Sequence, residues 1–234
     1  MKIYGHKTGF TIVEMIIVVA VIAILTTMVI GIASRIDSQS KERLMGETFE
    51  LLDVALEEFA EYGYEYDLEA FNGDERDFYA GLKFPVDCNG FSQGDLEGVL
   101  RDVLDVSVSV SGGDHEDEYS GSEVMYFLLS RVPSCRATLD KIHRPDKGGI
   151  VKSLITNKDA RGSDLQIEVD NRISPLLRVI DPWGRALRYD YYENETEGTL
   201  SWARRGGSKR SFPLITSAGP DGIFGNSDDI TNKK

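Results

Sequence analysis

The chain has 234 residues and is acidic, with 26 lysine and arginine residues against 39 aspartate and glutamate residues and a net charge of −13. This length is enough for one well-packed domain, with room for a sizeable insertion. The acidic balance argues against nucleic acid or anionic lipid as a broad partner and favours cations or basic protein surfaces.

The first 32 residues have the pattern of a membrane segment. A short leader, residues 1–9, carries Lys2 and Lys7, and it is followed by 23 almost wholly apolar residues, 10–32. As a helix this run would be about 34 Å long, which matches a bilayer core of about 30 Å. No small-residue cleavage site of the secretory type follows the run. We therefore expect a single retained span, oriented by the positive leader so that the rest of the chain lies on the far side of the membrane.

Glu14 places a carboxylate inside this apolar run. An acidic side chain there costs on the order of 2.5 to 3.5 kcal/mol by insertion scales. Pairing with a cationic group, such as a terminal ammonium in a bundle of helices, would make the buried charge tolerable. The simpler alternative is an ordinary signal anchor that carries an incidental glutamate.

The helix is predicted to continue through residues 33–62. No proline interrupts residues 38–62, and apolar side chains recur there with spacings of four, three, four and three: Met45, Phe49, Leu52, Leu56 and Phe59. Charged residues fill the other faces, which is typical of an amphipathic helix packed on a domain. The first half of the helix would pack on lipid or on copies of itself.

The middle of the chain, residues 63–176, is predicted to be mostly loops with short elements. Residues 95–104 and 122–132 have the pattern of short helices, the second one largely buried. Residues 106–110 and 165–169 alternate in the manner of strands. Residues 114–118, Asp-His-Glu-Asp-Glu, could be taken for a metal cluster. Adjacent loop residues seldom converge on one ion, so we expect a solvated acidic turn instead.

The cysteines of the chain are Cys88 and Cys135. If the domain lies beyond the membrane, oxidising conditions would let a disulfide persist there. We expect the two to pair, which would stabilise the fold by roughly 4 kcal/mol in the chain-entropy model. Two isolated thiols remain the alternative, because the sequence has no Cys-x-x-Cys spacing.

The carboxyl-terminal region, residues 177–234, is predicted to be a small sheet. The turn 181–184, Asp-Pro-Trp-Gly, precedes an alternating strand at 187–192, and further strands are expected at 199–203 and 212–216. The basic segment 204–210 is either a solvated hairpin tip or a contact to an acidic neighbouring subunit.

The residues around Gly9 carry a specific resemblance. Lys7-Thr8-Gly9, then Phe10-Thr11-Ile12-Val13-Glu14, then the apolar run, resembles the class III signal of type IV pilins and type II secretion pseudopilins. The resemblance implies that a prepilin peptidase cuts after Gly9 and that the new amino terminus, at Phe10, is methylated. It also implies that Glu14 attracts the amino terminus of a neighbouring subunit during assembly.

The end of the chain carries a second resemblance. The turn 181–184 together with residues 217–230 is similar to the calcium-binding loop of major (G-like) pseudopilins of type II secretion. This resemblance implies Ca²⁺ as a cofactor, with carboxylate ligands from Asp221, Asp228 and Asp229 and carbonyl ligands from Ala218 and Ile223. Calcium prefers six to eight oxygen ligands, which such a loop can supply. Alternatively, an Asp-Gly turn followed by acidic residues needs no ion.

These resemblances imply an α+β fold of the pilin type. A long helix, with a membrane half and an amphipathic half, would pack on a small three- or four-stranded antiparallel sheet, and residues 63–176 would be a large insertion between them. The implied function is that of a non-enzymatic pseudopilus subunit that assembles by helix packing. Its partners would be copies of itself, other pseudopilins, the prepilin peptidase and an inner-membrane assembly platform. The chain would cross the bacterial inner membrane once, with the domain on the periplasmic side and, after assembly, in a periplasmic filament.

Two other functions are alternatives. A type IV pilus subunit or minor pilin/adhesin would share the whole amino terminus, but the cysteine pair usual near the end of such proteins is missing here. A membrane-tethered hydrolase would need a complete catalytic set. The sequence has a single Gly-x-Ser-x-Gly, at residues 90–94, no His-Glu-x-x-His, and only three histidines, of which His6 lies in the leader. We therefore expect no enzymatic activity.

Overall fold

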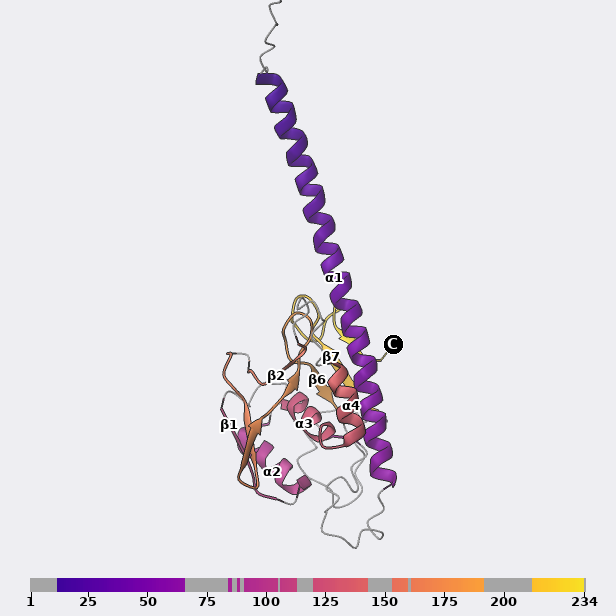
Figure 1. Ribbon diagram of the computed structural model, residues 1–234, viewed down its shortest axis with the longest axis vertical. Helices are drawn as coiled ribbons and strands as arrows, with labels where there is room; N and C mark the ends of the chain where they lie inside the picture. Colours follow the sequence, from indigo (N-terminus) through magenta and orange to yellow (C-terminus); the bar gives the residue numbers. More distant parts are fainter. Residues whose placement is uncertain are drawn as a thin grey trace, which may run out of the picture. The chain divides into compact units, whose positions relative to one another are not determined.

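The structure is a computed structural model that describes residues 12–65, 84–85, 88, 91–104, 106–112, 120–142, 153–159, 161–191 and 212–233. It has the predicted α+β composition, with a long amino-terminal helix and small antiparallel sheets (Figure 1). The helices are α1 (Ile12–Glu65), α2 (Gln93–Leu104), α3 (Ser120–Leu129) and α4 (Pro133–Ile142). The strands are β1 (Val108–Ser111), β2 (Ile155–Thr156), β3 (Gln166–Val169), β4 (Arg172–Pro175), β5 (Arg178–Val179), β6 (Arg188–Asp190), β7 (Leu214–Ser217) and β8 (Ile230–Thr231).

Several predicted features lie outside the described residues. These are the cleavage and methylation residues Gly9 and Phe10, the acidic turn 114–118, the strand 199–203 and the basic segment 204–210.

The chain forms two compact units, Met1–Lys41 and Glu42–Lys234. In the first unit, the described residues from Ile12 to Met28 are all exposed. Thr26 and Thr27 donate their hydroxyls to the helix carbonyls of Ile22 and Ile24, at 2.7 and 2.8 Å. Among the residues that the structure describes, no helix is both long enough and apolar enough to cross a membrane.

The second unit contains the amphipathic half of α1, and the predicted apolar stripe is confirmed as core. Its five residues are at most 4% exposed: Met45, Phe49, Leu52, Leu56 and Phe59. Helix α4 lies beside this half of α1 (Figure 1), where Cys135 Sγ donates to the Ala55 carbonyl at 3.2 Å. Thr138 Oγ1 donates to Glu58 Oε2 at 3.2 Å.

Helix α4 was not predicted. Its buried residues Cys135, Thr138, Leu139 and Ile142 do have helical spacing. Because two of the four are cysteine and threonine, the apolar signal of that spacing is weak.

The described strands form three antiparallel sheets, and the one in the carboxyl-terminal region, β6-β7-β8, is the predicted small sheet. Their orders are β1-β3-β4, β2-β5 and β6-β7-β8. The predicted strands at 106–110 and 165–169 are neighbours in the first sheet, where Val108 is opposite Val169. Each strand within the described ranges has two to four residues.

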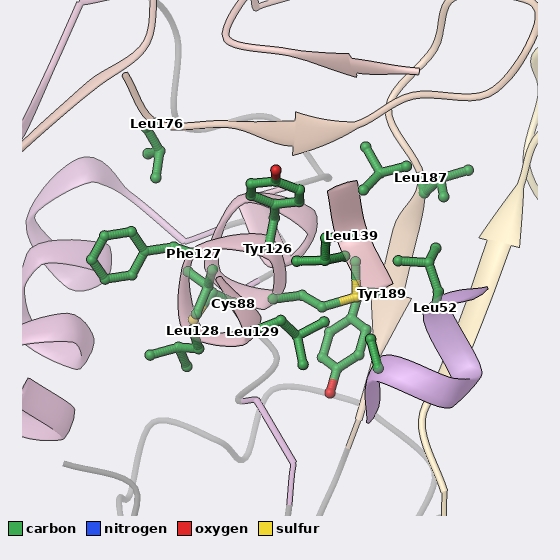
Figure 2. Packing of buried hydrophobic residues seen from close by; sticks show 14 of the residues in the cluster. Leu52, Cys88, Tyr126, Phe127, Leu128, Leu129, Leu139, Leu176, Leu187 and Tyr189 are labelled. Carbon is green, nitrogen blue, oxygen red and sulfur yellow. The ribbon is translucent and has the colours of Figure 1, made fainter. Parts of the chain in front are cut away.

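Helix α3 is the centre of the core and is buried on all sides. Tyr126, Phe127, Leu128 and Leu129 are each at most 9% exposed, and Figure 2 shows their side chains leaving the helix in different directions. Tyr189 of β6 reaches the same core and donates its hydroxyl to the Pro85 carbonyl at 2.7 Å. The predicted buried helix at 122–132 is thus confirmed, with its bounds shifted by two or three residues.

A buried ion pair joins α3 to β5. Arg178 Nη1 lies 3.3 Å from Glu123 Oε1, and the two side chains are 4% and 0% exposed. Arg178 Nε also donates to the Lys158 carbonyl at 3.0 Å. An ion pair this deep must satisfy its own hydrogen bonds, because each charge has lost its hydration.

The prediction of a disulfide between the two cysteines is wrong. Cys88 and Cys135 are both buried, and the structure does not join them by a disulfide. Instead, the Cys135 thiol donates a hydrogen bond to the Ala55 carbonyl of α1. Burial raises the pKa of Cys135 from 9.0 to about 12, so this sulfur stays a protonated thiol at neutral pH.

Candidate functional site

Glu14 is the described member of the predicted processing and assembly residues. It lies in the first turn of α1 and is exposed. A carboxylate at this end of a helix is favourable, because the helix macrodipole is positive there. The pairing of Glu14 with another subunit stays a prediction.

The second candidate site is the loop between β7 and β8, which carries the five residues predicted to bind calcium. Three glycines, Gly219, Gly222 and Gly225, have φ values of 61°, 73° and 92° and let the chain fold back on itself. At Gly219 a side chain is impossible without movement, since a Cβ atom would lie 2.2 Å from the Asp228 carbonyl oxygen. The two ends of the loop are therefore in direct contact.

The carboxylates of the loop accept hydrogen bonds from the loop itself. Asp221 Oδ1 accepts from the Ile223 amide at 2.8 Å, and its Oδ2 accepts from Asn226 Nδ2 at 2.8 Å. Asp228 Oδ2 accepts from the Asp221 amide at 3.3 Å, and Asp229 Oδ2 accepts from the Gly225 amide at 2.7 Å. The Ala218 carbonyl accepts from the Gly222 amide at 3.2 Å.

One carboxylate oxygen of the loop accepts no hydrogen bond within the described part of the chain. This oxygen is Asp229 Oδ1, which is buried. Such an atom is costly, on the order of 1 to 3 kcal/mol or more for a charged group, unless something else binds it. A hard cation that takes oxygen ligands would remove this cost.

In none of the described ranges do three or more His, Cys, Asp or Glu side chains form a group that could hold a metal ion. The structure thus brings the predicted ligands into one loop, with their side chains turned to loop N–H groups. All the predicted ligand atoms are carboxylate or carbonyl oxygens, which are the ligands that calcium prefers.

The loop is anchored where it begins by Asp181, the first residue of the predicted turn 181–184. Asp181 is 1% exposed, and its Oδ2 accepts the Ser217 hydroxyl at 2.8 Å. Ser217 Oγ in turn accepts from the Gly219 amide at 3.2 Å. Asp181 Oδ1 accepts from the amides of Trp183 and Arg185, at 3.0 and 2.9 Å, and thereby holds the turn 181–185.

Arg185 completes this anchor. Its Nη1 is 3.4 Å from the Gly219 carbonyl, and its guanidinium covers Gly222 so closely that a Cβ there would lie 1.4 Å from Nη1. The predicted turn at 181–184 is therefore part of the site, because it positions the first residues of the loop.

The same turn occurs a second time, 22 residues earlier. Asp159 Oδ1 accepts from the amides of Arg161 and Ser163, at 2.9 and 2.7 Å. Gly162 and Gly184 have φ values of 86° and 92° at matching positions. Each turn is closed by an isolated antiparallel bridge, Lys158 to Asp164 in one and Ile180 to Ala186 in the other.

The hairpins that follow the two turns also match. Leu165 donates its amide to the Asn157 carbonyl as Leu187 does to the Val179 carbonyl, and both leucines are fully buried. The sequence signal was available as Asp-x-x-Gly-x-x-Leu, at 159–165 and at 181–187. Part of the expected insertion is therefore a second copy of the turn that supports the candidate site.

Comparison with family models gives one match, the prokaryotic N-terminal methylation motif, over residues 5–30. No curated protein and no solved structure matches the chain. The matched segment includes Gly9, Phe10 and Glu14, the residues predicted for cleavage, methylation and assembly. The match supports a pilin-type subunit with a membrane-anchored amino terminus that is processed by a prepilin peptidase.

Proposed function

We propose that this chain is a structural subunit of a type II secretion pseudopilus, built into a helical filament after cleavage at Gly9 and methylation of Phe10. The methylation motif at residues 5–30 carries the proposal, because cleavage and amino-terminal methylation are the chemistry of filament subunits of the pilin type. The activity would be mechanical and not enzymatic, with the filament pushing secreted proteins outward.

The properties of the first unit support burial of its helix in an apolar environment. Its large apolar residues are exposed in the single chain, among them Ile12 at 81% and Met28 at 66%. The hydroxyls of Thr26 and Thr27 are already bonded within the helix and carry little desolvation penalty. We propose that residues 10–32 lie in the inner membrane before assembly and against identical helices afterwards.

In the assembled filament, Glu14 would pair with the methylated amine at Phe10 of a neighbouring copy. A buried carboxylate that loses its partner is strongly destabilising, typically by about 3 to 5 kcal/mol. Glu14→Gln should therefore leave the protein in the membrane and processed, but reduce incorporation into filaments. The nearby substitution Thr11→Ser is the matched control and should assemble normally.

The carboxyl-terminal loop favours a pseudopilus over a type IV pilus. Asp221, Asp228 and Asp229 share one loop, and the leftover Asp229 Oδ1 supports cation binding there. We propose Ca²⁺ as the ion, with the Ala218 and Ile223 carbonyls as further ligands. When bound, the ion would supply positive charge that holds the loop's oxygens together.

Deletion of the gene in the native host separates the two filament systems. A pseudopilus subunit predicts that protein secretion is lost while surface pili persist. Loss of surface pili with secretion intact would identify a type IV pilus subunit or minor pilin instead. Complementation with the unaltered gene, and with the Glu14→Gln variant, controls for effects on neighbouring genes.

A further inference from the structure

Asn232, just after β8, ties the end of the chain to two elements at once. Its amide N–H donates to the Ile215 carbonyl at 3.1 Å, and its Oδ1 accepts from the Ile215 amide at 2.9 Å. Its Nδ2 donates to the Pro213 carbonyl at 3.3 Å and to Asp53 Oδ1 at 2.6 Å. One side chain therefore connects the strand β7 to the helix α1.

The bond to Asp53 is formed where water is partly excluded. Asp53 is half-buried, and its pKa is raised above the ordinary value mainly because burial disfavours the charged form. The hydrogen bond from Asn232 acts in the opposite direction and stabilises the carboxylate, whereas the nearby Glu57 raises the pKa again and Lys233 lowers it. Asn232 is thus a direct hydrogen-bond donor to this helix carboxylate.

Only the two residues of β8 separate Asn232 from Asp229, the last predicted ligand of the loop. Ile230 and Thr231 pair with Ser217 and Thr216 of β7. Ser217 is also the residue that Asp181 holds at the beginning of the loop. Asp229 is therefore connected to Asn232 by a paired strand of only two residues.

We propose that Asn232 is a positioning residue that couples cation binding in the loop 218–229 to helix α1 through Asp53. This inference rests on the proposed binding of Ca²⁺ by the loop. An ion that fixes Asp229 fixes the register of β8, and with it the hydrogen bond between Asn232 and Asp53. The coupling is reciprocal, so breaking this bond must weaken cation binding by the factor by which the ion strengthens the bond.

The test is calorimetric titration of the full chain in detergent micelles with CaCl₂. The unaltered protein should bind one Ca²⁺. Asn232→Ala and Asp53→Ala should each weaken the affinity about 5- to 10-fold, the lower part of the range usual for coupled sites. The double variant should bind Ca²⁺ no more weakly than Asn232→Ala alone, because Asn232→Ala already removes the bond to Asp53.

Two further variants separate coupling from general loss of stability. Asp53→Asn keeps an oxygen that can accept the Asn232 amide bond, so it should bind Ca²⁺ nearly as tightly as the unaltered protein. Thr138→Val removes a different contact to α1, the bond from α4 to Glu58. It should lower the melting temperature without changing the affinity for Ca²⁺.

The outcomes are distinct. If the unaltered protein shows no Ca²⁺ binding, the proposed cation site is wrong and the coupling falls with it. If it binds but Asn232→Ala and Asp53→Ala bind equally well, the cation site stands and the coupling is overturned. Should Asn232→Ala fail to fold, Asp53→Ala and Asp53→Asn decide the question, since Asp53 belongs to α1 and not to the loop.

Discussion

Asp159 and Asp181 hold two turns of the same design, and Asp181 in addition accepts the hydroxyl of Ser217 at the beginning of the carboxyl-terminal loop. A comparison of the two residues can therefore distinguish the effect of losing such a turn from the effect of losing the contact to the candidate site. Each carboxylate accepts the amides two and four residues further on, which is a local arrangement of the Asx type.

Replacing the two aspartates should have different consequences for the loop. Asp159→Ala and Asp181→Ala should each lower the free energy of unfolding by about 2 kcal/mol, since each removes the carboxylate that accepts two part-buried backbone amides. Asp181→Ala should also expose residues 218–229 to limited proteolysis, because the bond to Ser217 is lost. Equal protease resistance of that loop in both variants would contradict the proposed anchoring role of Asp181.

The glycines of the loop provide a matched pair. Gly219→Ala places a Cβ against the Asp228 carbonyl, whereas at Gly225 no atom lies within 4 Å of an added Cβ. Both have positive φ, which costs roughly 1 to 2 kcal/mol for a residue with a Cβ. Gly225→Ala should show only this cost in thermal unfolding, and Gly219→Ala should lose distinctly more. Indistinguishable melting temperatures would argue against the close approach of the two loop ends.

The buried pair of Glu123 and Arg178 should be costly to break from one side. Arg178→Met should destabilise the protein by about 3 to 5 kcal/mol, because the Glu123 carboxylate is left buried without its cation. The double variant Glu123→Met, Arg178→Met should recover most of that loss in urea unfolding. As a control, Arg43→Gln removes an exposed pair with Glu47 and should cost less than about 1 kcal/mol. A small effect of Arg178→Met would show that the pair is hydrated.

The Cys135 thiol should make stability fall at high pH. Its pKa is raised to about 12 in the folded protein, against 9.0 ordinarily, so between these values the folded state binds more protons than the unfolded state. Stability therefore decreases as the pH rises through this window. From pH 8 to 10.5, the unaltered protein should lose up to about 2 kcal/mol relative to Cys135→Ala in denaturant unfolding. A pH-independent difference between the two proteins would mean that the thiol titrates normally.

The same burial predicts chemical protection of Cys135. At pH 8.5 the folded protein should react with iodoacetamide far more slowly at Cys135 than the urea-unfolded protein does, because the thiolate is the reacting species. Peptide mass spectrometry of the alkylated residue measures the two rates.

Strongly periodic segments could be predicted from the sequence. The stripe from Met45 to Phe59 is buried as expected, because its spacing places all five apolar side chains on one face of the helix. The helix around Leu128 is buried as expected because the side chains of residues 124–129 are all hydrophobic. Helix α4 was missed because Cys135 and Thr138 contribute half of its buried face. The expected disulfide was also wrong because of α4. On this helix the Cys135 thiol is buried against α1, where it donates to the Ala55 carbonyl.

The candidate site was predictable in its members but only partly in its supports. The five loop residues and the turn that begins at Asp181 follow from the family resemblance, whereas Arg185 and Asn232 act through contacts 15 or more residues away in the chain. Local patterns do not encode such pairings. The repeat of Asp-x-x-Gly-x-x-Leu was present in the sequence and could have been found by searching for internal similarity.

The central claim is that this chain is a processed filament subunit, and mass spectrometry of its amino-terminal peptide from the membrane fraction of the native host tests it most directly. The account predicts a mature chain that begins at Phe10 and is heavier by one methyl group. An uncut chain that begins at Met1 would contradict it, because residues 10–32 would then be a plain anchor without the amine that Glu14 is proposed to bind.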